Sequence, residues 1–189
     1  NPVLAAPAHG REYVYRFGPF DQKIAQDRDD VLVYSTKPLD EPLAFAGALY
    51  AQLYVSADTP DADWVVRVID THPDGFAHPL ATGVLRGSAR DSELHLSPME
   101  PGSIYQIHVD LGHCAARIEP GHKLSVQIAG SNFPVYDRNL HTGEGTAGTR
   151  SIISNEMVYH TRSRASRIFL PFINLEERLP GGHSINSQK

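Results

Sequence analysis

Apolar and polar residues alternate strictly along residues 105–111 and 123–128 of the chain. Successive side chains of a strand point to opposite faces, so this period of two predicts two strands, each with one buried and one solvent-facing side. We expect Val109 and Leu111 on the buried side of the first strand, and Val126 and Ile128 on that of the second.

Further short segments of β pattern are separated by turn residues such as Pro-Gly and Pro-Asp-Gly. The compact apolar run at residues 31–35 predicts a well-buried strand. The polar residues 22–30 could hold a turn of helix, but we expect a loop. No segment shows a convincing helical period, so the chain is predicted to be all-β, a jelly-roll β-sandwich. The other expected strands are residues 13–17, 44–56, 64–71, 83–90, 157–160 and 167–170.

The 189 residues, 41% of them apolar, are enough for one domain with a full core. We expect a single β-sandwich over residues 1–189, with a lead-in segment at 1–12 and a polar tail at 174–189. The net charge of -5 gives no reason to expect a nucleic-acid partner, and no apolar run is long enough to span a membrane. The lone Cys114 and the lack of a signal-peptide pattern favour the cytoplasm, although the localisation stays open.

The segment that organises the chain is residues 120–143, where a predicted strand runs into a loop rich in both apolar and hydrogen-bonding side chains. A loop of this composition is usually held in one shape and often presents a surface. It could dock on a neighbouring domain or line a ligand site, or its polar side chains could cap only its own backbone. The candidate docking residues are Asn132, Phe133, Tyr136, Asp137, Arg138 and Asn139.

Serine-hydrolase chemistry within the chain is not supported by its motifs. A nucleophile elbow requires G-x-S-x-G between a strand and a helix. Ser88 and Ser131 both lack the second glycine, so no catalytic residue is assigned. A free-standing carbohydrate-binding module of jelly-roll fold is the alternative function, although Trp64 begins a predicted strand and is expected in the core rather than on a sugar-stacking surface.

No cofactor or metal is expected from the sequence. Asp58, Asp61 and Asp63 are close together, but the Gly and the final Glu of an EF-hand loop are missing, and acidic residues before a strand are ordinary in turns. Two histidine pairs can be considered as zinc ligands, His72 with His78 and His108 with His113. Neither pair has a further histidine pair or cysteines nearby in the sequence at the spacing of a zinc site.

Several motifs, taken in order, resemble a known family. They are RDDVLVYSTKPL at residues 28–39, residues 63–70 with PDG at 73–75, TG at 82–83 with Arg90, PGSIY at 101–105, GHKL at 121–124 and SNFPVYDRN with TG at 131–143. Over roughly residues 18–171 the chain resembles the C-terminal domain of X-Pro dipeptidyl-peptidases and of cocaine-esterase-like (CocE/NonD) serine hydrolases. α-Amino-acid ester hydrolases and glutaryl acylases belong to the same group.

The resemblance implies a jelly roll of the galactose-binding type that follows an α/β-hydrolase domain and a helical cap. The family's Ser, Asp and His triad lies in that catalytic domain, and none of it maps onto this sequence. The chain would then be a non-catalytic accessory domain that docks on the hydrolase domain and helps to shape the substrate entrance. In isolation, its exposed docking face could also mediate self-association. The substrate of the parent enzyme, an X-Pro peptide, an amino-acid ester or another acyl compound, stays open.

Overall fold

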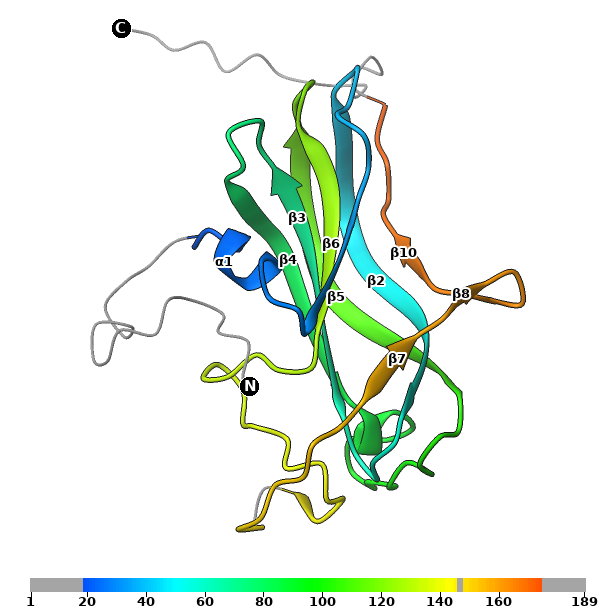
Figure 1. Cartoon of the computed structure of the whole chain (residues 1–189). Coiled ribbons are helices and arrows are strands. Elements are labelled where there is room, and N and C mark those ends of the chain that lie inside the picture. The colour runs from blue at the N-terminus through cyan, green and yellow to red at the C-terminus, as the bar shows by residue number, and fades with distance from the viewer. Residues whose placement is uncertain (1–18, 146–147, 175–189) are drawn as a thin grey trace, which may run out of the picture.

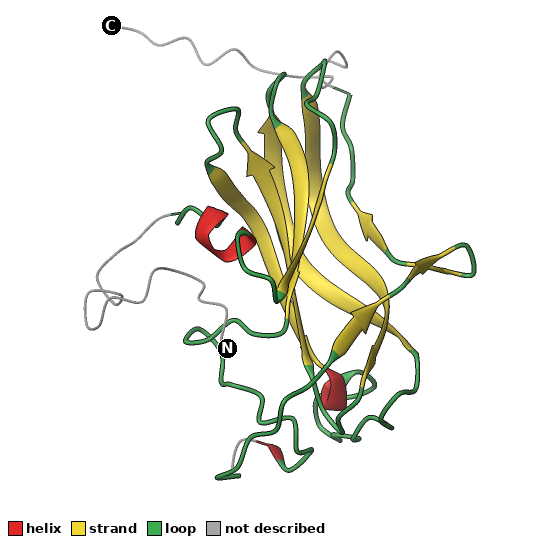
Figure 2. Cartoon of the chain, in the orientation of Figure 1, coloured by secondary structure: helices red, strands yellow, loops and turns green. Residues whose placement is uncertain are grey.

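Two antiparallel β-sheets pack face to face in a computed structural model of the chain, which describes residues 19–145 and 148–174 (Figures 1 and 2). The described part is almost entirely strand and loop, as predicted. The expected strand at 13–17, the lead-in at 1–12 and the tail from residue 175 lie outside the described residues.

The first sheet has the strand order β1-β6-β3-β4, and all of its neighbours are antiparallel. The strand bounds are β1 (Val31–Ser35), β3 (Asp63–Thr71), β4 (Ala77–Arg86) and β6 (Lys123–Ala129). A one-turn helix, α1 (Lys23–Gln26), precedes β1, and the short 3-10 helix η2 (Gly87–Ala89) follows β4. The polar segment 22–30, expected to be a loop, therefore contains a helical turn.

The second sheet is built on the long strand β2 (Leu43–Ala57), which pairs with β5 (Tyr105–Ile118) along one edge. The opposite edge of β2 is shared by two short strands, β10 (Arg167–Phe169) and β7 (Glu156–Val158). Between these two, the chain makes a small hairpin of β8 (His160–Thr161) and β9 (Arg164–Ala165). The C-terminal part of the chain thus follows one edge of the sandwich (Figure 1).

The hydrophobic core fills the space between the two sheets. Its largest side chains have relative exposures of 1% or less: Phe45, Leu49, Leu53, Trp64, Val66, Val68 and Ile118. Trp64 is a core residue, as predicted, and is not available as a sugar-stacking platform. The sheets also approach closely at Gly83 of β4, where an added Cβ would lie 2.1 Å from the backbone oxygen of Asp110.

The predicted inner face of β5 is confirmed, because Ile107, Val109 and Leu111 are all buried. The prediction that β6 has one solvent-facing side is wrong. Ser125 and Gln127, expected in water, are 1% and 0% exposed. Since β6 lies between β1 and β3, its outer side chains are flanked by those of both neighbours.

The prediction of a well-buried strand at residues 31–35 is also wrong. Val31 is buried in a small outer cluster with Ala25 of α1 and Val65. Leu32, Val33 and Tyr34 keep relative exposures of 42%, 38% and 38%. The reason is topological, because β1 is the edge strand of its sheet and has β6 on one side only.

The all-β sandwich agrees with the fold prediction, whereas its assignment to the galactose-binding type stays a prediction. No helix among the described residues is long and apolar enough to cross a membrane.

Candidate docking surface and pocket

The loop from Gly130 to Gly143 leaves the end of β6 and carries all six candidate docking residues. At its start, Asn132 is buried, and its side-chain oxygen accepts a hydrogen bond from the buried guanidinium of Arg67. The backbone oxygen of Asn132 accepts hydrogen bonds from the amides of Val135 and Tyr136 at 2.9 and 3.2 Å. Asn132 therefore ties the first turn of the loop to the sheet.

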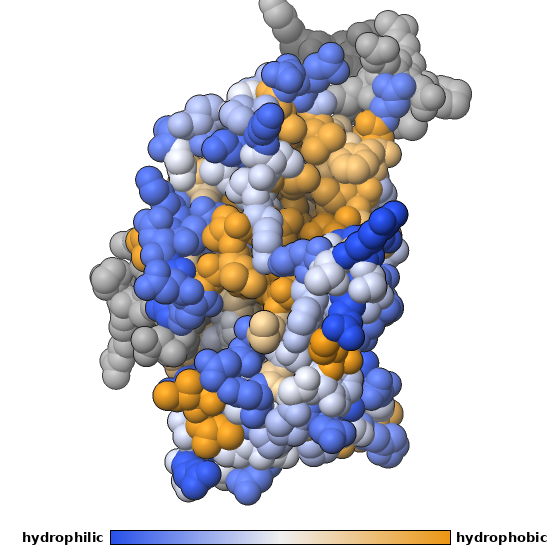
Figure 3. Space-filling view, turned by 45° about the vertical axis from the view of Figure 1, so that its right-hand side comes forward, coloured by the Kyte–Doolittle hydropathy of each residue, from blue (hydrophilic) through white to orange (hydrophobic). Residues whose placement is uncertain are grey.

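The tip of the loop presents apolar side chains to solvent. Phe133, Val135 and Tyr136 have relative exposures of 39%, 52% and 53%. Figure 3 shows the apolar surface of one face gathered into separate patches, one of them at the lower end of the molecule. The outward orientation expected for Tyr136 fits this arrangement.

The second half of the loop is anchored to the start of β3, to the residues just before it and to the end of β4. Asn139 donates a hydrogen bond of 2.7 Å to Asp63 Oδ1, and its own side-chain oxygen accepts from the amide of His141 at 2.8 Å. The ring Nδ1 of His141 lies 3.1 Å from the backbone oxygen of Asp61. Asp137 takes part through its backbone oxygen, 3.4 Å from Arg86 Nη2, rather than through a carboxylate cap.

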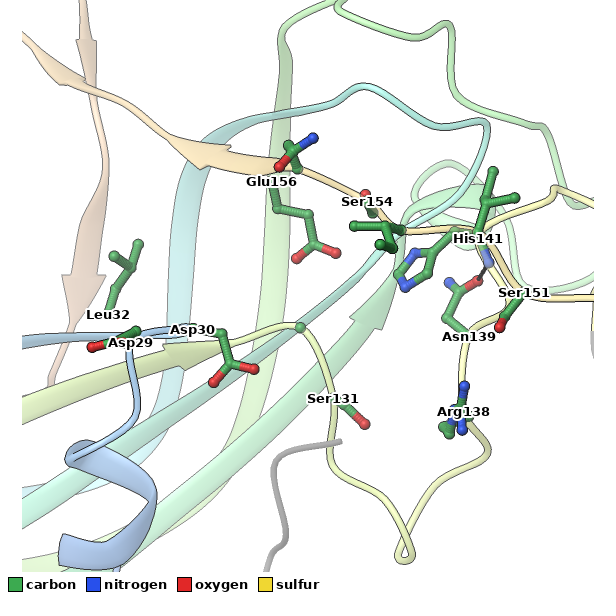
Figure 4. Close-up of a pocket in the computed structure, with 14 residues that line it drawn as sticks. Asp29, Asp30, Leu32, Ser131, Arg138, Asn139, His141, Ser151, Ser154 and Glu156 are labelled. Carbon is green, nitrogen blue, oxygen red and sulfur yellow. Dashed lines mark hydrogen bonds between the residues drawn. The ribbon is translucent and has the colours of Figure 1, made fainter. Parts of the chain in front are cut away.

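The loop, β1 and the segment 151–156 enclose a pocket with a volume of about 570 Å³. Its lining is mostly polar, and Figure 4 shows the side chains of Asp30, Glu156 and His141 around the same space. The predicted residues Arg138 and Asn139 both line it. The remaining lining residues are Asp29, Leu32, Gly130, Ser131, Ser151, Ile152, Ile153, Ser154 and Asn155.

Glu156 gives the pocket its unusual electrostatic character. Burial raises the pKa of its carboxyl to about 8, and the negative charges of Asp63, Asp58 and Asp61 add to this shift. At neutral pH the side chain is therefore mostly protonated and can donate a hydrogen bond. Gly130 leaves room for it, because a Cβ at that position would lie 2.9 Å from Glu156 Oε2. Glu156 could not be singled out from the sequence, because most of the residues around it in the pocket are distant along the chain.

The acidic residues considered for calcium have separate protein partners. Asp61 accepts hydrogen bonds from the amides of Ala62 and Ser88 and from the Ser88 hydroxyl. Asp58 accepts from Asn155. Asp63 is paired with Arg86 and Asn139 (Nε–Oδ1 2.9 Å for Arg86). These carboxylates hold loops against the sandwich, which agrees with the turn interpretation.

The serines considered as nucleophiles have structural partners as well. Ser88 donates to Asp61 at 3.0 Å, and Ser131 Oγ accepts from the amide of Phe133 at 3.2 Å. Within the part of the chain that the structure describes, no serine hydroxyl is hydrogen-bonded to a histidine ring.

The histidine pairs expected from the sequence are not the groups that the fold forms. His72 lies closer to His122, with ring centroids 4.4 Å apart, than to His78, at 6.2 Å. His72 and His122 share the carboxylate of Asp70, and their possible ligand atoms lie within 4.8 Å of one another. His108 and His113 are exposed on the other sheet. Sequence spacing could not reveal this cluster, because His122 is far from the other two along the chain.

Comparison with known proteins agrees with this geometry. Residues 4–168 match the family described as the X-Pro dipeptidyl-peptidase C-terminal non-catalytic domain. The chain is 40% identical over 146 residues to cocaine esterase from Rhodococcus sp. (strain MB1 Bresler), which covers 76% of this chain and 25% of that protein. The chain thus spans about a quarter of the length of this relative.

Two solved structures share the fold. The crystal structure of an aminopeptidase from a marine sediment archaeon, Thaumarchaeota archaeon, matches with a TM-score of 0.85 and 29% identity, over 92% of this chain and 32% of that one. An α-amino acid ester hydrolase matches with a TM-score of 0.76 and 32% identity, over 81% of this chain and 27% of that one. The match over residues 4–168 shows that the chain belongs to the family of X-Pro dipeptidyl-peptidase C-terminal non-catalytic domains.

Proposed function

We propose that the chain docks on the α/β-hydrolase domain of a serine hydrolase, stabilises it and forms part of its substrate entrance. The observation that carries this proposal is the exposure of large apolar side chains on two segments that flank one pocket. These are the loop tip, with Phe133, Val135 and Tyr136, and the edge strand β1, with Leu32 and Val33. Exposed apolar surface of this kind is typical of an interaction site.

The polar lining of the pocket supports the same assignment. Contacts between domains of one chain are more polar than obligate interfaces, so apolar anchors next to charged groups fit such a contact. Arg138 and Asp30 lie on opposite sides of the pocket and would meet groups of the catalytic domain (Figure 4). The covalent chemistry, acyl transfer through a serine with an oxyanion hole, would belong to that domain.

The substrate class comes from the relatives and stays broad. The similar proteins are named as an esterase, an amino-acid ester hydrolase and an aminopeptidase. We therefore propose that the parent enzyme hydrolyses an ester or amide of a small acyl or aminoacyl group. The isolated chain should not turn over p-nitrophenyl acetate or an X-Pro nitroanilide above background. Turnover that disappeared on replacing one serine of this chain would contradict the proposal.

The docking role is tested by the double substitution Tyr136→Ala with Arg138→Ala. In the intact enzyme it should lower the melting temperature or the activity. In the isolated chain it should change the unfolding free energy by no more than about 0.5 kcal/mol, as surface substitutions usually do. The matched control is Tyr54→Ala, which alters a tyrosine of β2 outside the pocket. Equal destabilisation in both contexts would show that the loop supports only its own domain.

A further inference from the structure

Three side chains of metal-ligand type meet at the end of the first sheet that lies away from the docking loop (Figure 1). They are Asp70 and His72, at the end of β3, and His122, in the turn before β6. This cluster shares no residue with the pocket or with the loop. It is therefore distinct from the candidate docking surface.

The antiparallel pairing of β3 with β6 brings these three side chains together. Asp70 lies opposite Leu124 and Thr71 opposite Lys123, so His72 and His122 occupy the next opposed positions as the strands end. Their backbones are held by turn hydrogen bonds, from the His72 amide to Phe76 at 2.9 Å and from the His122 amide to Glu119 at 3.1 Å. The two imidazoles are thus brought together by regular structure rather than by mobile side chains.

The possible ligand atoms of the three side chains lie within 4.8 Å of one another, close enough for one ion to contact all three. His122 Nδ1 lies 2.9 Å from one carboxylate oxygen of Asp70, and His72 Nε2 lies 3.5 Å from the other. In a tetrahedral zinc site with bonds of about 2.0–2.1 Å, neighbouring ligand atoms are about 3.4 Å apart. The Asp70 side chain is 10% exposed and that of His122 19%, so a bound ion would be partly shielded from water.

We propose that Asp70, His72 and His122 bind one zinc ion, with water in the remaining position. Two imidazole nitrogens and a single carboxylate favour zinc over calcium or magnesium, which prefer oxygen ligands. The Asp70 carboxylate offsets part of the charge of the ion. The ion would join the β3-β4 hairpin to the turn at residues 119–122, so its role is structural stabilisation of this end of the sandwich.

Isothermal titration of the untagged, EDTA-treated chain with zinc chloride tests the proposal. We expect one ion per chain. His72→Asn and His122→Asn should each weaken binding by at least about tenfold, since even the loss of supporting groups around a metal has effects of this size. His108→Asn is the matched control, because it removes an exposed histidine of the other sheet and should leave binding unchanged.

A second readout separates true coordination from loose association. Cobalt(II) in place of zinc should give visible absorption bands of a four- or five-coordinate site, and these bands should be lost in the His122→Asn chain. Zinc should also raise the melting temperature of the parent but not that of the His72→Asn variant. His72 is exposed enough for this variant to fold (side chain 31% exposed), which circular dichroism without metal would check. Absence of binding, or equal binding by parent and both variants, would overturn the proposal.

Discussion

Asp63 of β3 and Arg86 of β4 lie opposite each other in the paired strands and form a two-pronged ion pair. The distances are 2.9 Å from Arg86 Nε to Asp63 Oδ1 and 3.0 Å from Nη2 to Oδ2. The same carboxylate accepts a hydrogen bond from Asn139 of the loop at residues 130–143. The loop is therefore held by the body of the sandwich, in addition to its own turn at Asn132.

Replacement of Arg86 should remove the ion pair with Asp63 and weaken the attachment of the loop to the sandwich. Asp63 is 4% exposed, so Arg86→Ala leaves a buried carboxylate without its cation. We expect a loss of about 1.5–3 kcal/mol in unfolding free energy, the range for hydrogen bonds to charged groups. Arg86→Lys keeps the charge but not the planar fork and should recover only part of this loss. Urea unfolding measures the change, and faster proteolysis within residues 133–145 should accompany it. Full recovery with Lys would contradict the importance of the fork.

Substitutions at two neighbouring positions of β6 should change the unfolding free energy in different ways. Ile128→Ala removes a buried side chain from the main core and should cost about 2–5 kcal/mol. Gln127 is fully buried, and neither of its side-chain polar atoms has a hydrogen-bond partner among the residues that the structure describes. Gln127→Leu should therefore be neutral or stabilising, because an unpaired buried amide is costly. Urea unfolding of both variants tests this, and clear destabilisation by Gln127→Leu would show that the amide makes a needed interaction.

The contrast between β5 and β6 shows how far the sequence pattern predicts the fold. In β5 the polar positions His108 and Asp110 are exposed, so alternation identified the buried face correctly. In β6 the same alternation failed, because Ser125 is covered between hydroxyl partners from both neighbouring strands. Its Oγ lies 2.8 Å from Ser35 Oγ and 2.8 Å from Thr71 Oγ1. The alternation of apolar and polar residues distinguishes the two faces of a strand, but it does not show which neighbouring residues cover each face.

The candidate site was predictable only in part. The composition of the loop indicated a surface built from Tyr136 and Arg138, and its motif indicated the family. Glu156 and the Asp70–His122 contact could not be predicted, because they depend on strand register and on approach between distant segments. Spacing along the chain likewise does not show that the pairing of β3 and β6 brings Asp70, His72 and His122 together.

The raised pKa of Glu156 predicts that stability falls as pH rises. Its folded pKa of about 8 lies above the unfolded value of 4.5, so between these values the folded state binds the extra proton. This contribution is fully present below pH 4.5 and is lost as pH rises toward about 8, with a slope of up to about 1.4 kcal/mol per pH unit. Glu156→Gln keeps a neutral side chain at all pH values and should flatten this dependence. Unfolding curves at pH 5, 7 and 9 measure it, and parallel pH profiles of parent and variant would contradict the prediction.

The exposed apolar residues of β1 should matter to the intact enzyme more than to this chain. The double substitution Leu32→Thr with Val33→Thr replaces two apolar side chains that are 42% and 38% exposed. Threonine is common in strands, so β1 should keep its conformation. In the isolated chain the unfolding free energy should change by only about 0.5 kcal/mol, and any concentration-dependent self-association, measured by analytical ultracentrifugation, should decrease. In the intact enzyme the same double substitution should lower the melting temperature, because it removes the proposed apolar contact with the catalytic domain.

The matched control is Val31→Thr. Val31 is buried against Ala25 and Val65, so this substitution should destabilise the isolated chain and the intact enzyme alike. If the pair left the intact enzyme unchanged while Val31→Thr destabilised it, β1 would lie outside the docking surface, and the loop tip at Phe133–Tyr136 would be its whole apolar part.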